Sequence, residues 1–174
     1  MGGMRIFRAG YVFDGEGWRP GSEVLVEDDG TVLDVRPVQP TPDGALVVDH
    51  GPGTTLLPGL VDGHQHLSWG CQPSALDGLP EDSAAQRAQA TDNARRALGG
   101  GVTTVQDLGD SDYAVVDVRD ASLGDRSLPR ILASGPPITT PGGHCHFLLG
   151  AQTAPAGIAD AVRSVPSAAS TSSR

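Results

Sequence analysis

Two histidines separated by one residue, His64 and His66, end the apolar run LLPGLVDGHQHL at residues 56–67. If this run is a strand, its alternation places both imidazoles on one face, with Asp62 at the same parity one step earlier. Two imidazoles on one face can hold a divalent metal ion at ~2.0–2.1 Å per nitrogen. The alternative is that both residues simply begin a surface loop. The strand-like residues before them favour the metal, because chemistry in parallel α/β folds sits where strands end.

The elements that must position this pair change in kind along the chain. Residues 4–57 consist of short β-forming runs, with a hairpin signal around Asp29-Gly30, and predict a small all-β unit. From residue 57 onward, strand and helix patterns alternate. Strands are expected at 60–67, 102–108 and 130–138, with helices at 81–101 and 111–124. This order predicts βαβ units and a parallel sheet.

The helix ends carry recognisable signals. The first helix has acidic residues at its start and arginines near its end, and Gly99 to Gly101 are suited to its C-cap. For the second helix we expect Ser111 or Asp112 as the N-cap, with Val115 and Val118 on one buried face.

Composition excludes several classes of function. The 174 residues carry a net charge of −9, which argues against nucleic-acid binding, and no stretch approaches the ~20 apolar residues of a membrane span. Two cysteines, Cys71 and Cys145, do not form a disulfide framework, so a reducing cytoplasm is the expected location. From residue 164 the chain becomes small and polar and reads as a disordered tail.

Three blocks of sequence resemble the metal-dependent amidohydrolase superfamily. Pro58 to His66 match its motif P-G-[LI]-[VI]-D-x-H-x-H at every defined position. GGGVTTVQDLGD (99–110) is similar to the family's second strand, and RILASGPPITTPGGHCHF (130–147) to its third strand and following loop. The last block points to the imidazolonepropionase-like and prolidase-like branch. The resemblance extends from Ile6 to Gly150.

The resemblance implies an α/β fold: a partial TIM (β/α)8 barrel, comprising the first three βα units, preceded by a small β-sandwich segment. The corresponding divisions are 1–57 for the sandwich segment, 58–163 for the barrel units and 164–174 for a disordered or out-of-frame tail. The implied activity is hydrolysis of a C–N bond in a small-molecule substrate, by water activated on one or two divalent ions, usually zinc.

The same resemblance implies roles for individual residues. His64 and His66 match the first two metal ligands, and His144 matches a position that faces substrate. We expect Asp62 and Asp107 to support the site from behind the ligands. Two alternatives stay open, because His144 could equally be a solvated loop histidine and Asp107 a purely structural buried carboxylate.

The family's remaining ligands have no counterpart in this sequence. They include a carboxylated lysine, and the chain contains no lysine; the general base is expected beyond its residues. We therefore expect a truncated, inactive fragment that ends early or changes reading frame near Ser164. Its expected partners are further copies of itself, in a homo-oligomer, or a complementing C-terminal polypeptide. The alternative class is a non-catalytic metal-binding or partner-binding module, of which one form is a site built from His64, His66, His144 and His146.

Overall fold

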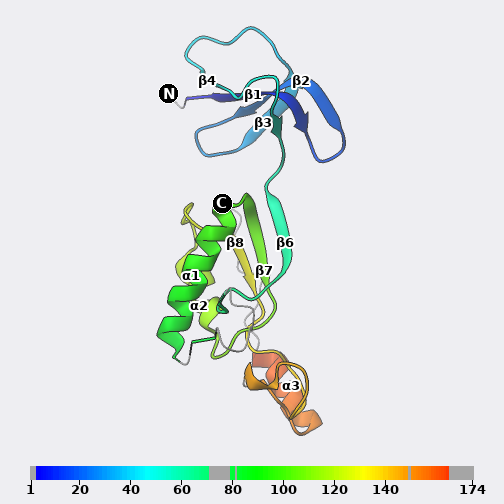
Figure 1. Ribbon diagram of the computed structural model, residues 1–174, viewed down its shortest axis with the longest axis vertical. Coiled ribbons are helices and arrows are strands. Elements are labelled where there is room, and N and C mark those ends of the chain that lie inside the picture. Colours follow the sequence, from blue (N-terminus) through cyan, green and yellow to red (C-terminus); the bar gives the residue numbers. More distant parts are fainter. Residues whose placement is uncertain (1–2, 71–78, 81, 149, 165–174) are drawn as a thin grey trace. The chain divides into compact units, whose positions relative to one another are not determined.

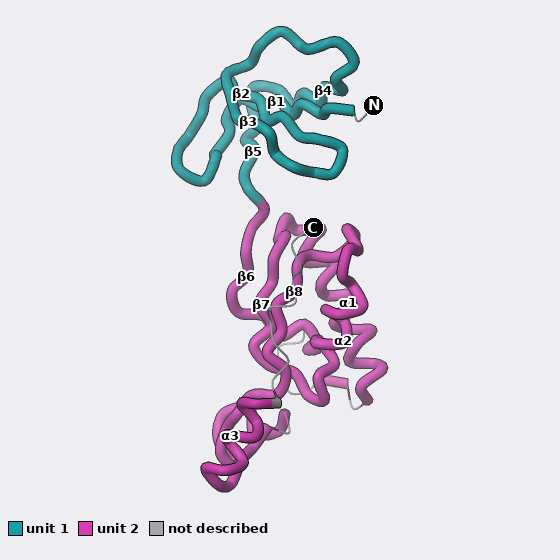
Figure 2. Tube along the Cα trace, turned by 180° about the vertical axis from the view of Figure 1, so that it is seen from behind, with its two compact units in different colours: residues 1–58 teal, residues 59–174 magenta. Residues whose placement is uncertain are grey.

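The computed structural model describes residues 3–70, 79–80, 82–148 and 150–164. The chain divides into two compact units, Met1–Pro58 and Gly59–Arg174, which Figure 2 colours separately. Cys71 and the polar residues 165–174 lie outside the described residues.

The first unit is built on a five-stranded sheet with the order β3-β2-β1-β4, in which β5 also pairs with β1. β1, β2 and β3 are antiparallel neighbours, whereas β4 and β5 run parallel to β1. The hairpin predicted around Asp29-Gly30 is confirmed, since these residues lie in the turn between β2 and β3. The described residues of this unit form one sheet only. The strands are β1 (Arg5–Phe13), β2 (Trp18–Val26), β3 (Val32–Pro37), β4 (Leu46–Asp49) and β5 (Thr55–Leu56).

A buried carboxylate forms ion pairs that join three strands of this sheet. Glu23 on β2 is fully buried and lies between Arg8 on β1 and Arg36 on β3, at 3.0 Å from the Nε atom of each. Burial by itself would raise the pKa of Glu23, but the hydrogen bonds from the two guanidinium groups outweigh it, and the pKa is lowered. Two ion pairs, and not apolar packing, therefore connect the three strands at this point.

The second unit contains the predicted βαβ arrangement. Its three strands are parallel and ordered β6-β7-β8. Two helices connect them, with α1 packed against β7, α2 against β8, and the two helices against each other, as Figure 1 shows. The elements are β6 (Leu60–Gln65), α1 (Ser83–Gly99), β7 (Val102–Asp107), α2 (Ala114–Ala121) and β8 (Arg130–Ala133), followed by a 3-10 turn (His146–Leu148) and α3 (Pro155–Ser164). Among the described residues, no helix has the length and apolar character needed to cross a bilayer.

The apolar core of this unit lies between the sheet and its two helices. Val105 on β7, Ile131 on β8 and Ala94 on α1 are buried in one cluster with residues of α2. The predicted buried face of α2 is confirmed, because Val115 and Val118 both belong to this cluster. Burial of this apolar surface fixes the strand ends relative to one another.

The two helices begin differently from each other. Asp82 caps α1 through a hydrogen bond from the backbone N–H of Ala85 at 2.8 Å, and Gly100 is the C-cap, as the glycine run predicts. The expected N-cap of α2 at Ser111 or Asp112 is wrong, because the N-cap position is Tyr113, in left-handed conformation with φ 57°.

The carboxylate of Asp110 takes over the capping role in α2. It is fully buried and accepts the backbone N–H of Val115. The hydroxyl of Ser111 instead donates to the side chain of Gln86 on α1, at 2.8 Å. Packing between the helices therefore engages Ser111 elsewhere and leaves the orphan N–H of the first turn to Asp110.

Candidate metal centre

The paired histidines lie where β6 leaves the sheet. The ladder between β6 and β7 ends at the pair Gln65 and Asp107, and the N–H of Leu108 donates to the carbonyl of Gln65 at 3.0 Å. The strand was expected to continue to Leu67, but it ends at Gln65. The N–H of Leu67, a fully buried residue, is instead held by Oδ2 of Asp107 at 2.6 Å.

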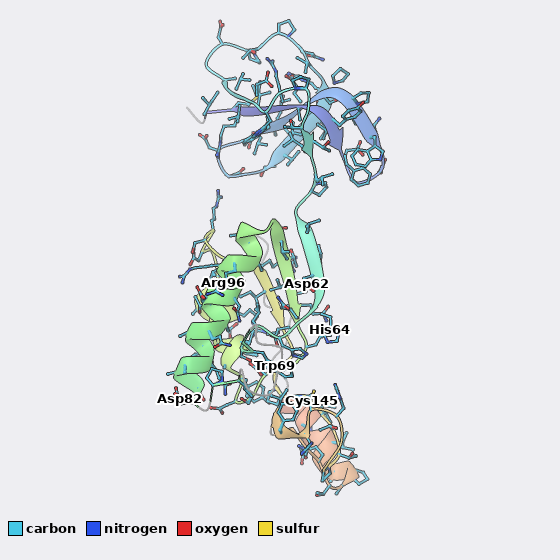
Figure 3. All side chains as sticks on the ribbon, in the orientation of Figure 1. Asp62, His64, Trp69, Asp82, Arg96 and Cys145 are labelled. Atoms are coloured by element: carbon cyan, nitrogen blue, oxygen red, sulfur yellow. The ribbon has the colours of Figure 1, made fainter. Side chains whose placement is uncertain are left out.

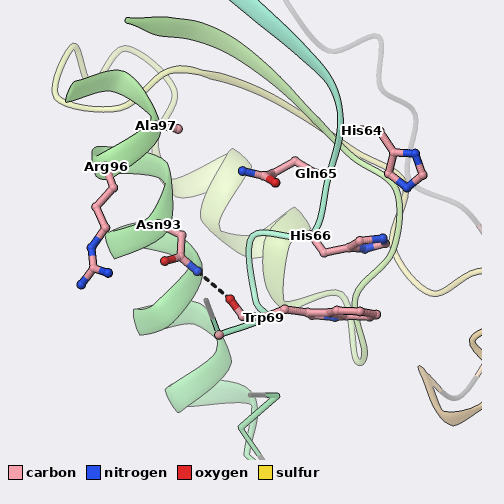
Figure 4. Close-up of a pocket in the computed structure, with 8 residues that line it drawn as sticks. His64, Gln65, His66, Trp69, Asn93, Arg96 and Ala97 are labelled. Atoms are coloured by element: carbon pink, nitrogen blue, oxygen red, sulfur yellow. Dashed lines mark hydrogen bonds between the residues drawn. The ribbon is translucent and has the colours of Figure 1, made fainter. Parts of the chain in front are cut away.

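His64 and His66 project from the same side of this strand end, and Gln65 projects from the other, as Figure 4 shows. Their ring centroids are 5.4 Å apart and the ring planes are inclined by 68°. At ~2.0–2.1 Å from nitrogen to metal, two imidazoles on one tetrahedral ion have centroids roughly 5 Å apart. The spacing of the rings is therefore compatible with a shared ion.

Asp62 stands earlier on the same strand, as Figure 3 shows together with His64. Its Oδ1 accepts the backbone N–H of His64 at 3.1 Å. The carboxylate thus contacts the backbone of a candidate ligand and not an imidazole ring. This hydrogen bond fixes the local path of the chain at His64.

His66 is held from two directions. Its Nδ1 lies 2.9 Å from the carbonyl oxygen of Gly109, and its ring stacks on the indole of Trp69 with centroids 4.4 Å apart and planes inclined by 15°. The amide of Asn93 on α1 donates to the carbonyls of Leu67 and Trp69, both at 2.8 Å, and ties this turn to the helix. Sequence patterns do not point to Trp69, Asn93 or Gly109, because only the folded chain brings them to His66.

Two buried carboxylates lie at the end of β7 and just after it, Asp107 and Asp110. Burial raises the pKa of Asp107 to about 7; the backbone N–H groups of Leu67 and Gly109 oppose this rise, and the charge of Asp110 adds to it. Burial likewise raises the pKa of Asp110 to about 6. Oδ1 of Asp110 has no hydrogen-bond partner within the described part of the chain. Through the N–H of Leu67, Asp107 is joined to the residue that directly follows His66.

A cavity of about 460 Å³ lies beside β6 and α1. His64, His66, Gln65, Asn93 and Arg96 are among the residues that line it. Arg96 is already paired with Asp92, at 2.6 Å. In Figure 4 the side chain of Gln65 extends toward α1, whereas both imidazoles extend to the opposite side of the strand.

The other histidines do not complete a metal site. His144 is exposed in its turn, and Nδ1 of His146 contacts the carbonyl oxygen of Gly143 at 3.0 Å. Across the described ranges, no group of three or more His, Cys, Asp or Glu side chains could hold a metal ion. The four-histidine site considered from the sequence is therefore not formed. His64 and His66 fit two positions of a zinc ligand set, and further ligands would have to come from elsewhere.

Comparison with known proteins decides the family. A sequence model described as the amidohydrolase family matches residues 55–172. The chain belongs to the amidohydrolase family. The match begins before the Pro58 motif and runs past Ser164, where the apolar pattern ends. Members of this family are generally metal-dependent hydrolases.

Solved structures of hydrolases resemble this amidohydrolase chain. A Xaa-Pro dipeptidase with bound methionine in its active site is 26% identical, with a TM-score of 0.80 over 92% of this chain and 43% of the other. A putative prolidase from Bifidobacterium longum is 30% identical, with a TM-score of 0.62 over 82% of this chain and 32% of the other. Molinate hydrolase is 28% identical, with a TM-score of 0.65 over 80% and 31%.

The amidohydrolase chain thus spans less than half the length of each of these structures. A search of curated proteins found no match. The mixed α/β fold follows from these likenesses.

Proposed function

We propose that this chain takes part in metal-dependent hydrolysis of a C–N bond, in an amide, a cyclic amide or a peptide-like substrate. It would do so as the first three βα units of a TIM barrel, preceded by a β-sandwich segment. One observation carries the proposal: His64 and His66 project together from the carboxyl end of a parallel strand. Catalytic groups of TIM barrels gather at these strand ends.

Within this proposal each site residue has a definite task. His64 and His66 bind one of one or two divalent ions, most simply zinc. Asp62 fixes the backbone of His64, Asp107 supports His66, and His144 faces the substrate. A metal ion held there would supply Lewis acidity, which lowers the pKa of water and polarises a carbonyl.

The 174-residue polypeptide alone is proposed to bind metal without turnover. Its sequence contains no lysine to serve as the carboxylated ligand, and its described residues supply two imidazoles to the site. Turnover would require later barrel strands that carry the remaining ligands. We also propose the cytoplasm as its compartment, which the free thiol of Cys145 supports.

Zinc binding tests the assignment of the two ligands. Equilibrium dialysis of the purified chain should give one zinc per chain, and His64→Ala and His66→Ala should each weaken binding by at least about tenfold. His50→Ala is the matched control, because His50 stacks near Phe7 in the first unit and belongs to no candidate site. Undiminished zinc binding by both site variants would contradict the proposal.

Hydrolysis assays address the substrate class. The likeness to a Xaa-Pro dipeptidase and to a putative prolidase supports Xaa-Pro dipeptides as the first substrates to try, followed by N-acyl amino acids and cyclic amides. These assays use the chain alone and then the chain mixed with a polypeptide carrying the later barrel strands of a prolidase-type relative. Turnover that appears only in the mixture is the expected result.

A ligand set of only two imidazoles among the described residues supports a second candidate function. Because the described residues contain no group of three or more metal-binding side chains, a non-catalytic metal-binding or partner-binding module accounts for the same geometry. Stoichiometric zinc binding without turnover in either assay favours this module. Turnover in the mixture favours the enzyme.

A further inference from the structure

The carboxylate of Asp107 forms a brace: its two oxygens hold the two chain segments that meet where His66 contacts Gly109. Oδ2 accepts the backbone N–H of Leu67 at 2.6 Å, and Oδ1 accepts the backbone N–H of Gly109 at 3.1 Å. Leu67 directly follows His66, and the carbonyl oxygen of Gly109 is the partner of His66 Nδ1 at 2.9 Å. Each oxygen of Asp107 therefore holds one of the two segments whose contact orients the imidazole.

This contact determines which ring nitrogen carries the proton. A carbonyl oxygen can only accept a hydrogen bond, so Nδ1 of His66 must be the donor. In a neutral imidazole the other nitrogen, Nε2, then holds the free lone pair. The stacked indole of Trp69 limits rotation of the ring out of this orientation.

A side chain is needed here because the backbone ladder has ended. β6 pairs with β7 up to Gln65, after which the chain turns away and the N–H of Leu67 loses its strand partner. An unpaired N–H at a fully buried residue is costly, and so is a buried carboxylate. Each satisfies the other, and the second oxygen of Asp107 remains to bind Gly109.

We propose that Asp107 is a positioning residue that acts through the backbone of Leu67 and Gly109. It holds His66 in the tautomer protonated at Nδ1 and thereby presents Nε2 to a divalent cation. The identity of the ligand as a cation rests on the proposed function. The tautomer itself is a property of the metal-free chain.

The first test needs no variant of Asp107. Long-range ¹H–¹⁵N NMR spectra of the metal-free chain, recorded at a pH where the ring is neutral, report which nitrogen is protonated. The signals of His66 are identified by their loss in His66→Ala. Predominant protonation at Nδ1 is the expected result, and predominant protonation at Nε2 overturns the proposal even if every Asp107 variant fails to fold.

The second test removes one of the two hydrogen bonds that Asp107 accepts. In Asp107→Asn the amide oxygen can accept one N–H group, but the amide nitrogen cannot accept the other. We expect a mixture of His66 tautomers and zinc affinity weakened by about 10–100-fold, the range typical for loss of a partner that orients a metal ligand. Retention of a pure Nδ1–H tautomer in this variant contradicts the proposal.

Asp110→Asn is the matched control. Asp110 is also fully buried, follows the same strand and caps α2 through Val115, but no hydrogen bond joins it to the His66 turn among the described residues. Its asparagine variant keeps an acceptor for Val115. We expect the tautomer and the zinc affinity to stay unchanged, and an equal change in both variants would reduce Asp107 to a general structural role and overturn the proposal.

The two proposals fail in different ways. If zinc does not bind through His64 and His66, the proposed function is wrong, yet the tautomer of His66 still tests the brace. If zinc binds but Asp107→Asn leaves the tautomer unchanged, the brace is wrong and the function stands.

Discussion

The imidazole of His66 stacks on the indole of Trp69, with ring centroids 4.4 Å apart and planes inclined by 15°. This contact joins the candidate metal centre to an intrinsic spectroscopic reporter. The chain contains two tryptophans, and the other one, Trp18, lies in the first unit beside Phe13. Fluorescence can therefore observe His66 without any added label.

Binding of Cu²⁺ at the histidine pair should quench Trp69. In the Trp18→Phe variant, which retains only Trp69, saturating Cu²⁺ is expected to remove most of the emission because the ion lies within a few ångströms of the indole. His66→Ala should abolish the quenching, and Trp69→Phe, which retains only Trp18, should show little of it. Steady-state titration measures this, and undiminished emission of Trp18→Phe at saturation would exclude a metal ion at His66.

The buried carboxylate of Asp110 should make stability depend on pH. Burial raises its pKa from 3.8 to about 6 in the folded chain, so the native state binds the proton more tightly than the unfolded state does. The free energy of unfolding should therefore decline as the pH rises from about 4 to about 6. In Asp110→Asn this decline should be smaller. Across that range the free energy of unfolding of the variant should therefore rise by about 1–3 kcal/mol relative to that of the wild type.

Urea denaturation at a series of pH values measures this difference. Asp43→Asn controls for the loss of one negative charge, because Asp43 is exposed in the first unit. Parallel stability curves for the wild type and Asp110→Asn would show that the burial of Asp110 does not influence stability.

Glu23 should have the opposite pH dependence. Its pKa is lowered by the hydrogen bonds of Arg8 and Arg36, although its burial opposes this, so the stability it contributes is present above the unfolded pKa and is lost as the pH falls through the folded value. Glu23→Gln should cost the first unit about 2–3 kcal/mol at neutral pH. This lies below the ~3–5 kcal/mol of fully buried pairs, because both arginines are partly solvated.

Chemical denaturation followed by Trp18 fluorescence reports on this unit. The exposed Glu16→Gln variant removes the same charge and should leave stability nearly unchanged. Equal effects of the two variants would mean that the contacts of Glu23 with the two arginines contribute nothing beyond overall charge.

The outer strands of the second sheet should promote self-association. Within the described residues, β6 and β8 each pair with one strand, and Val61 on β6 is 70% exposed. Unpaired strand edges with apolar side chains recruit further strands. Val61→Lys should therefore shift the chain toward the monomer in sedimentation velocity, whereas Val162→Lys on α3, also exposed, should not. Identical sedimentation of Val61→Lys and the wild type would show that this edge is not the associating surface.

Local patterns were sufficient to predict most of the elements. The hairpin at Asp29-Gly30, the C-cap of α1 at Gly100, and the buried face of α2 each depend on residues close together in sequence. Such features follow from turn geometry, capping and helical periodicity, which a short segment expresses by itself. The N-cap of α2 could not be predicted in this way, since contacts with α1 engage Ser111 and leave the role to Asp110.

In the candidate site, too, local features could be predicted from the sequence and long-range contacts could not. The sequence by itself determined that His64 and His66 share a parity and follow an apolar strand, because alternation along a strand is a local property. Only the tertiary structure decided that Gly109, 43 residues away, accepts from His66 and that Asp107 braces the contact. The physical reason is that a buried N–H group must find a partner where a ladder ends, and packing of the whole unit determines which side chain is near enough to serve.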